Sequence, residues 1–292
     1  MRSFGHTLYI AVLVGIVGSS LLIIGLRGFG FYTTPAGERP FHAQYDSLKP
    51  TGFEGHGYGI VGTALIIGGV AIYSARKRVR FLRDVGKLKH FLEFHIFLCL
   101  LGPILVTYHT TFKIGGLVAV SYWCMVAVVA SGIIGRYLYV QIPKGIQGNE
   151  LSTDELTQRG ARIFELLRRT YGVDLDVIKE LDHIAVPPKK PSEMSLWDVA
   201  SFVVVNDLTR RMRIRALVGG LRRKGVDPRM LRAIRALANQ RTVLIRRVAF
   251  LEQLRQVFHY WHVIHLPFSI VMFAILFLHV GVAIAFGYTW IW

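Results

Sequence analysis

Five long apolar stretches alternate with polar, charged stretches along the chain. The apolar stretches cover roughly residues 6–26, 57–75, 91–110, 116–140 and 261–286. Each is close to the ~20 residues that an α-helix needs to cross a bilayer. The fourth and fifth stretches are separated by residues 141–258, which are too polar to span a membrane. The pattern predicts an all-α integral membrane protein with five transmembrane helices and a large polar insert.

The insert itself has helical patterns. One helix is expected from about residue 195 to 221, ending near the glycines at 219–220 or at Gly225. Asp227 followed by Pro228 is typical of the first residues of another helix. From there no helix breaker precedes the fifth apolar stretch, so the pattern predicts one very long helix. The expected organisation is transmembrane helices one to four in 1–140, a basic helical cytoplasmic insert in 141–258, and the fifth transmembrane helix with an outer carboxyl terminus in 259–292.

Composition supports a membrane protein with a basic soluble part. The chain combines 52% hydrophobic residues and a mean hydropathy of +0.42 with a net charge of +17. Nucleic-acid binding, the usual alternative for a basic chain, is not favoured, because long uncharged apolar runs separate the basic clusters. The two cysteines, Cys99 and Cys124, lie in different apolar stretches and form no CxxC motif. Covalently attached haem, structural zinc and a chain-borne iron–sulfur cluster are therefore not expected.

The distribution of basic residues predicts the orientation. The link between the third and fourth apolar stretches offers only Lys113, whereas the link between the second and third is strongly basic. Its basic residues are Arg76, Lys77, Arg78, Arg80, Arg83, Lys87 and Lys89. Because cytoplasmic links carry the excess of Lys and Arg, the amino terminus is expected in the cytoplasm and the carboxyl terminus outside. The third and fifth helices then run parallel.

Two histidine pairs share one spacing on these two parallel helices. His95 and His109 are 14 residues apart, and so are His265 and His279. On an α-helix this interval is nearly four turns, so the two rings of each pair share a face and lie about 21 Å apart along the axis. The topology pairs His95 with His265 and His109 with His279. Because polar groups within a membrane are costly, we interpret the pairs as axial ligands of two haems rather than as ordinary hydrogen-bonded residues.

Three further residues are candidates for the haem environment. Gly102 lies midway between His95 and His109, where a small residue would open space between two haems; simple helix packing is the alternative. Arg136 and Lys113, near opposite ends of the fourth stretch, are candidate partners of haem propionates, or interfacial residues whose charge reaches the membrane surface.

Other histidines leave alternatives open. His259 and His262 precede His265 at three-residue steps, and they are candidates for a quinone pocket, a propionate contact or an interfacial anchor. His56, at the start of the second stretch, is a candidate for an outer quinone site or a third haem.

The spacings His95-x13-His109 and His265-x13-His279, with the run WHVIHLPF at 261–268, resemble the paired-histidine helices of membrane cytochromes b. The resemblance covers the last four apolar stretches and is greatest to bacterial cytochrome b-like respiratory subunits. It implies a four-helix bundle with two b-type haems and electron transfer across a bacterial inner membrane. The chain lacks the Pro-Glu-Trp-Tyr motif of the outer quinol site in quinol–cytochrome c oxidoreductases.

The sequence offers no flavin, cluster or nucleotide motif of its own. A subunit carrying an iron–sulfur cluster, a flavin or a cytochrome c, or else a quinone, would therefore exchange electrons with the haems, and membrane lipid would surround the helices. The second function class is a non-redox membrane protein, either a histidine-lined metal transporter or an assembly scaffold. Transporters usually carry carboxylates within the membrane, and here only Glu93 lies near the end of a span.

Overall fold

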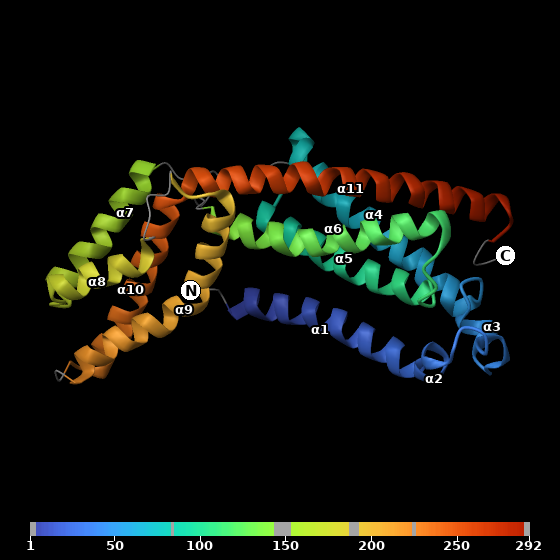
Figure 1. Cartoon of the computed structure of the whole chain (residues 1–292), viewed down its shortest axis with the longest axis horizontal. Helices are drawn as coiled ribbons and strands as arrows, with labels where there is room; N and C mark the ends of the chain where they lie inside the picture. Colours follow the sequence, from blue (N-terminus) through green and yellow to red (C-terminus); the bar gives the residue numbers. More distant parts are fainter. Residues whose placement is uncertain (1–3, 83–84, 143–152, 187–192, 224–225, 289–292) are drawn as a thin grey trace. The chain divides into compact units, whose positions relative to one another are not determined.

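The computed structural model describes residues 4–82, 85–142, 153–186, 193–223 and 226–288. All regular secondary structure in these ranges is helical (Figure 1). The helices are α1 (Phe4–Arg27), α2 (Phe29–Thr33), α3 (Tyr45–Leu48), α4 (Phe53–Arg78), α5 (Leu88–His109), α6 (Gly116–Gln141), α7 (Thr153–Glu165), α8 (Leu175–Ala185), α9 (Leu196–Arg223), α10 (Pro228–Ala249) and α11 (Leu251–Ala285). Short 3₁₀ turns at Arg39–Phe41 and Arg80–Leu82 and a π-helical turn at Leu166–Thr170 complete the order.

Five of these segments are long and apolar enough to cross a membrane, which confirms the predicted number. They are Phe4–Arg27, Tyr45–Arg78, Leu88–His109, Gly116–Gln141 and Leu251–Ala285, the second of which includes α3 and α4. The chain divides into two compact units: residues 1–133 with 264–292, and residues 134–263. The divisions at 133/134 and 263/264 fall inside α6 and α11, whereas the predicted divisions were at 140/141, at the end of α6, and at 258/259, also inside α11.

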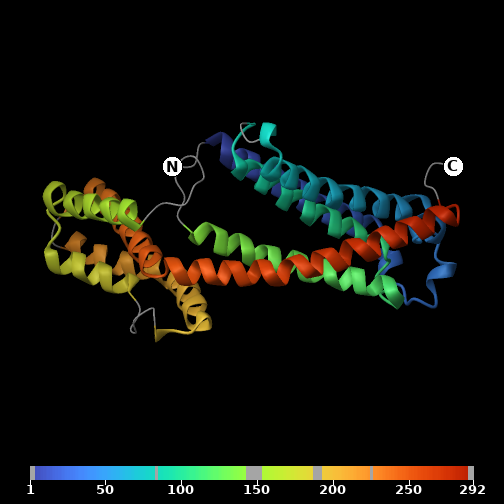
Figure 2. The same ribbon diagram turned by 90° about the horizontal axis from the view of Figure 1, so that it is seen from above.

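In the first unit, α4 and α5 pack antiparallel along their whole length (Figure 2). The two helices approach most closely where Gly62 meets Gly102. A Cβ atom added to Gly102 would lie 2.7 Å from the Gly62 carbonyl oxygen, and one added to Gly62 would lie 2.8 Å from the Gly102 carbonyl oxygen. Small residues at this crossing let the backbones touch. The pair fixes the register of α4 against α5.

The other helices of this unit join the same bundle. The Tyr108 hydroxyl donates to the Leu21 carbonyl (3.0 Å), which ties α1 to α5. The Ser121 hydroxyl donates to the Met272 carbonyl (2.9 Å), which ties α6 to α11. One apolar cluster contains buried side chains of α4, α6 and α11, with Val106 of α5 packed against it; its buried members are Ile66, Cys124, Met125 and Met272. Side chains of four helices, α4, α5, α6 and α11, therefore contribute to one apolar cluster.

In the second unit, α7 to α10 form a helical domain around apolar clusters of their own. The largest cluster brings together buried residues of α8, α9 and α10, among them Ile178, Ile214 and Ile234. The predicted start of α10 is confirmed, because Pro228 is its first residue and the Asp227 carboxylate accepts from the Arg229 backbone N–H (2.6 Å).

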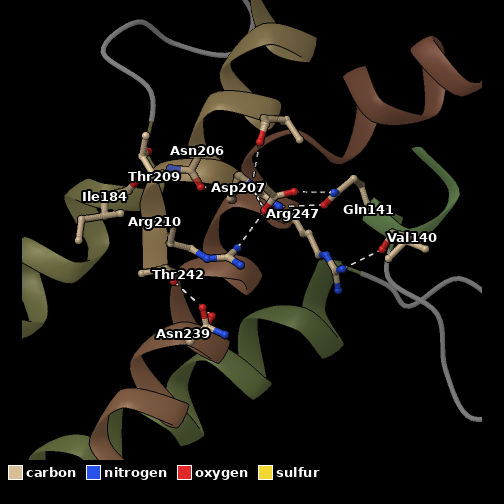
Figure 3. A network of polar contacts seen from close by, with 12 residues as sticks. Val140, Gln141, Ile184, Asn206, Asp207, Thr209, Arg210, Asn239, Thr242 and Arg247 are labelled. Carbon is tan, nitrogen blue, oxygen red and sulfur yellow. Dashed lines mark hydrogen bonds and ion pairs between the residues drawn. The ribbon is translucent and has the colours of Figure 1, made fainter. Parts of the chain in front are cut away.

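A buried polar network holds the end of α6 within the second unit (Figure 3). The Arg246 side chain is only 2% exposed and donates to Asp207 Oδ1 (2.7 Å) and to Gln141 Oε1 (2.8 Å). Tyr137 and Gln141 of α6 also donate to Asp207 Oδ2, each at 2.8 Å. Burial raises the pKa of Asp207, but the hydrogen bonds from Arg246 and Tyr137 outweigh it and hold the pKa below its ordinary value of 3.8. The carboxylate is therefore charged and fully engaged.

The prediction of one unbroken helix from residue 228 into the last span is wrong. The helix breaks at Phe250, whose φ of −113° and ψ of 17° lie outside the helical range. The Phe250 side chain is completely buried in a cluster with Val199, Val203 and Leu254. Packing this ring inward turns the chain between α10 and α11 (Figure 1). The helix predicted from about residue 195 is confirmed as α9, which passes through Gly219 and Gly220 and ends at Arg223, two residues before Gly225, the second of the two predicted ends.

Candidate functional site

His95 and His109 of α5 are both held by carbonyl groups of α4. His95 Nδ1 lies 3.0 Å from the Gly69 carbonyl oxygen, and His109 Nδ1 lies 2.8 Å from the Gly55 carbonyl oxygen. A carbonyl oxygen only accepts, so Nδ1 of each ring carries the hydrogen and Nε2 carries the lone pair. This is the arrangement of a metal-ligating histidine, whose second nitrogen is oriented by a backbone carbonyl.

The rings fit closely against α4. A Cβ atom added to Gly59 would lie 2.8–2.9 Å from three atoms of the His109 ring. The ring of Tyr73 lies 5.3 Å from that of His95, at an angle of 30°. Both imidazoles are half-buried. Because they are packed on one side and hydrogen-bonded at Nδ1, the two rings have little freedom to rotate.

His265 of α11 is oriented by α6 in a similar way. Ser131 Oγ donates to the Val128 carbonyl (3.0 Å) and lies 2.7 Å from His265 Nδ1. A serine hydroxyl both donates and accepts, so this contact orients the His265 ring and leaves Nε2 facing away from Ser131.

His279 completes the second pair. It is half-buried on the face of α11 that also carries His265 and the buried Met272, each seven residues from the next. The His56 and His109 ring centroids are 6.2 Å apart, so His56 lies beside His109. The pairing of His109 with His279 stays a prediction.

The supporting residues lie in different surroundings. Gly102 is buried against Gly62 and Ile66 of α4, which favours the alternative of helix packing. Lys113 is exposed in the turn that follows α5. The Arg136 guanidinium lies over the ring of Tyr139, 5.6 Å from its centroid, in the second unit. The propionate role predicted for Lys113 and Arg136 stays a prediction.

His259 and His262 of α11 are exposed and lie among aromatic rings. The ring centroid of His262 lies 5.0 Å from that of Trp261 and 5.8 Å from that of Phe258. The ring centroids of His259 and Tyr260 are 5.9 Å apart. Tyr and Trp are common at membrane–water interfaces, so these contacts favour the interfacial-anchor alternative.

The turn that ends α5 is held by a buried arginine. Thr111 and Phe112 have φ angles of 48° and 59°, which non-glycine residues rarely adopt. The Arg39 guanidinium donates to the Thr34 carbonyl (2.8 Å) and also to the Thr111 carbonyl. The residue is buried, with 8% of its surface exposed. Arg39 therefore stabilises the turn two residues beyond His109, a contact that the sequence did not indicate.

A comparison of this chain with family models, with curated proteins and with solved structures finds no match.

Proposed function

We propose that this chain is a membrane cytochrome b, an electron-transfer subunit that moves electrons across a bilayer through two b-type haems. His95 and His265 would hold one haem iron, and His109 and His279 the other. The observation that carries the proposal is the state of the histidines: His95 and His109 donate from Nδ1 to backbone carbonyls, which leaves Nε2 as the ligating atom, and His265 Nδ1 is hydrogen-bonded to Ser131 Oγ.

The donor set fits haem. Two axial imidazoles are typical of low-spin haem that passes single electrons and has no open position for oxygen. The hydrogen bonds to Gly69, Gly55 and Ser131 fix the ring orientations, and those to the two backbone carbonyls raise the basicity of Nε2. Bound haem would supply the one-electron chemistry, and the chain's residues would set the position and the electrostatic surroundings of each iron.

The proposed orientation places His95 and His265 toward the cytoplasm and His109 and His279 toward the outside of a bacterial inner membrane. The parallel course of α5 and α11 on which this depends is supported by two antiparallel contacts: the Thr107 hydroxyl of α5 lies 3.5 Å from the Tyr122 hydroxyl of α6, and α6 is hydrogen-bonded to α11 at Met272 and His265. The exchange of electrons with a quinone or with another redox subunit belongs to the same proposal.

The experiment is a reduced-minus-oxidised optical spectrum with haem quantitation on the purified full chain. We expect two b-type haems per chain. Replacement of His95 or His265 by alanine should remove one haem, and replacement of His109 or His279 the other.

The control is the same replacement at His183, which lies in α8 of the second unit. It should leave both haems in place. A chain that binds no haem, but binds divalent metal at these four histidines, would overturn the proposal in favour of a metal transporter.

A further inference from the structure

A second group of metal-ligating side chains lies where α5 begins. Glu93 Oε1 is 3.6 Å from His6 Nε2, and Glu93 Oε2 is 3.2 Å from His90 Nδ1. One ligand atom of each of the three residues lies within 4.8 Å of the others. We propose that His6, His90 and Glu93 form a binding site for a divalent transition-metal ion such as Zn²⁺. The site is separate from the haem histidines and does not depend on the proposed function.

The site is built by two helices that lie side by side. His90 and Glu93 are three residues apart on α5 and therefore share a face. α1 supplies His6, and the contact of Tyr108 with Leu21 further along fixes α1 against α5 in a parallel course. The rings of His6 and His90 have centroids 5.5 Å apart. A bound ion would therefore link α1 to α5.

The chemistry of the donors suits a borderline metal ion. Zn²⁺ takes imidazole nitrogen and carboxylate oxygen at about 2.0–2.2 Å, which sets neighbouring ligand atoms about 3.3–3.6 Å apart in a tetrahedron. His6 Nε2 lies 3.6 Å from one oxygen of Glu93 and His90 Nδ1 lies 3.2 Å from the other, so each imidazole nitrogen is close to this range from a carboxylate oxygen. Three protein ligands and one water would complete the coordination. Two nitrogen donors and one carboxylate favour Zn²⁺ or another first-row transition ion over Ca²⁺ or Mg²⁺.

A lysine ammonium stands close to where the ion would bind. Lys89 Nζ donates to His6 Nε2 at 3.0 Å and lies 3.6 Å from Glu93 Oε1. The neutral His6 ring then carries its hydrogen on Nδ1, and the Nε2 lone pair points into the cluster. The Glu93 side chain is only 5% exposed, whereas that of Lys89 is 48% exposed. Lys89 can therefore turn outward and give its place beside the buried carboxylate to a metal ion.

The test uses the full-length protein in detergent, with Zn²⁺ alone as the probe. Binding is measured by competition with a chromogenic chelator, and metal content after dialysis by elemental analysis. We expect one tight site in the native chain. His6→Gln, His90→Gln and Glu93→Gln should each weaken Zn²⁺ binding by more than the ~10–100-fold that loss of an outer-shell partner costs.

Lys89→Gln is the informative control, because it removes the competing ammonium and keeps all three ligands. We expect it to bind Zn²⁺ at least as tightly as the native chain. Zn²⁺ bound by chance to a surface histidine would not bind more tightly after Lys89→Gln and more weakly after the three ligand substitutions. His183→Gln, in the second unit, should leave binding unchanged.

Folding of each variant is followed by thermal unfolding and by the haem content of the native preparation. Equal Zn²⁺ affinity in the native chain and in the three ligand variants would overturn the proposal, as would the absence of a tight site. If the chain binds Zn²⁺ as expected but contains no haem, the metal site stands and the proposed function fails. If it contains two haems and no tight Zn²⁺ site, the proposed function stands and the metal site fails.

Discussion

The sharpest test of the haem arrangement is a single methyl group on α4. In Gly59→Ala the new Cβ would lie 2.8–2.9 Å from three atoms of the His109 ring. Carbon atoms normally approach to about 3.5 Å, so the ring has to move by about 0.6–0.7 Å or the helices have to separate. Ligating groups need to be held within ~0.5 Å of their working position. The hydrogen bond from His109 to Gly55, now 2.8 Å, would lengthen or break.

Overpacking of this kind costs about 1–3 kcal/mol, which corresponds to roughly a 5- to 150-fold loss of affinity for the haem proposed at His109. The haem proposed at His95 and His265 should be retained, because His95 meets α4 at Gly69, on a different turn of the helix from Gly59. The measurement is haem per chain together with the reduced-minus-oxidised spectrum. We expect the loss, or a spectral shift, of one of two components.

Gly68→Ala is the matched control. Gly68 lies on the same helix, and its replacement by alanine brings the same gain in helix propensity of about 1 kcal/mol. A Cβ atom added at Gly68 has no atom within 4 Å. If Gly59→Ala kept both haems and had the spectrum of Gly68→Ala, the packing of His109 against α4 would be refuted as the basis of the outer site.

Three further predictions concern packing and charge. Arg246→Met should lower the free energy of unfolding of the second unit by about 3 kcal/mol, because Asp207 loses its main partner. Arg235→Met, at an exposed position of the same helix, should have little effect, and chemical unfolding of the two variants tests this difference. Because the pKa of Asp207 is depressed in the folded chain, the carboxylate stabilises the fold at pH values above its ordinary pKa of 3.8, and this stabilisation is lost as the pH falls below that value. If the unfolding midpoints of the native chain and of Asp207→Asn depended equally on acid, this prediction would be contradicted. Gly102→Ala should destabilise the first unit by about 1–3 kcal/mol, because the added Cβ meets backbone 2.7 Å away, while Gly132→Ala, with open space around it, should not; the melting temperature distinguishes them.

The parts of the fold that depend on local sequence could be predicted. Hydropathy over about 20 residues is a local property, so the five spans were found with ends within a few residues of the helices, apart from the start of α11. The histidine pairs were found because a spacing of 14 residues is readable on each helix alone. The break at Phe250 was missed because residues 228–285 contain no helix breaker before Pro267. The break arises from burial of the Phe250 ring, which depends on α9 and α6.

The partners of the histidines could not be predicted in the same way, because they depend on the register between helices. Nothing near Ser131 in the sequence indicates that it lies beside His265, 134 residues later. The group of His6, His90 and Glu93 is a further example. The interval between His90 and Glu93 is visible on α5, but His6 joins them only because α1 packs parallel to α5.

One sign of the register was nevertheless present in the chain. The acceptors Gly55 and Gly69 on α4 are 14 residues apart, the same interval as His109 and His95 on α5. Gly62 and Gly102 meet at the midpoint, seven residues from each end. Because seven residues make nearly two turns, an antiparallel pair of helices in contact at one such point meets again seven residues away on either side. A search for equal intervals on different helices, rather than for motifs on each, would have paired α4 with α5 from sequence and predicted which carbonyls orient the two imidazoles.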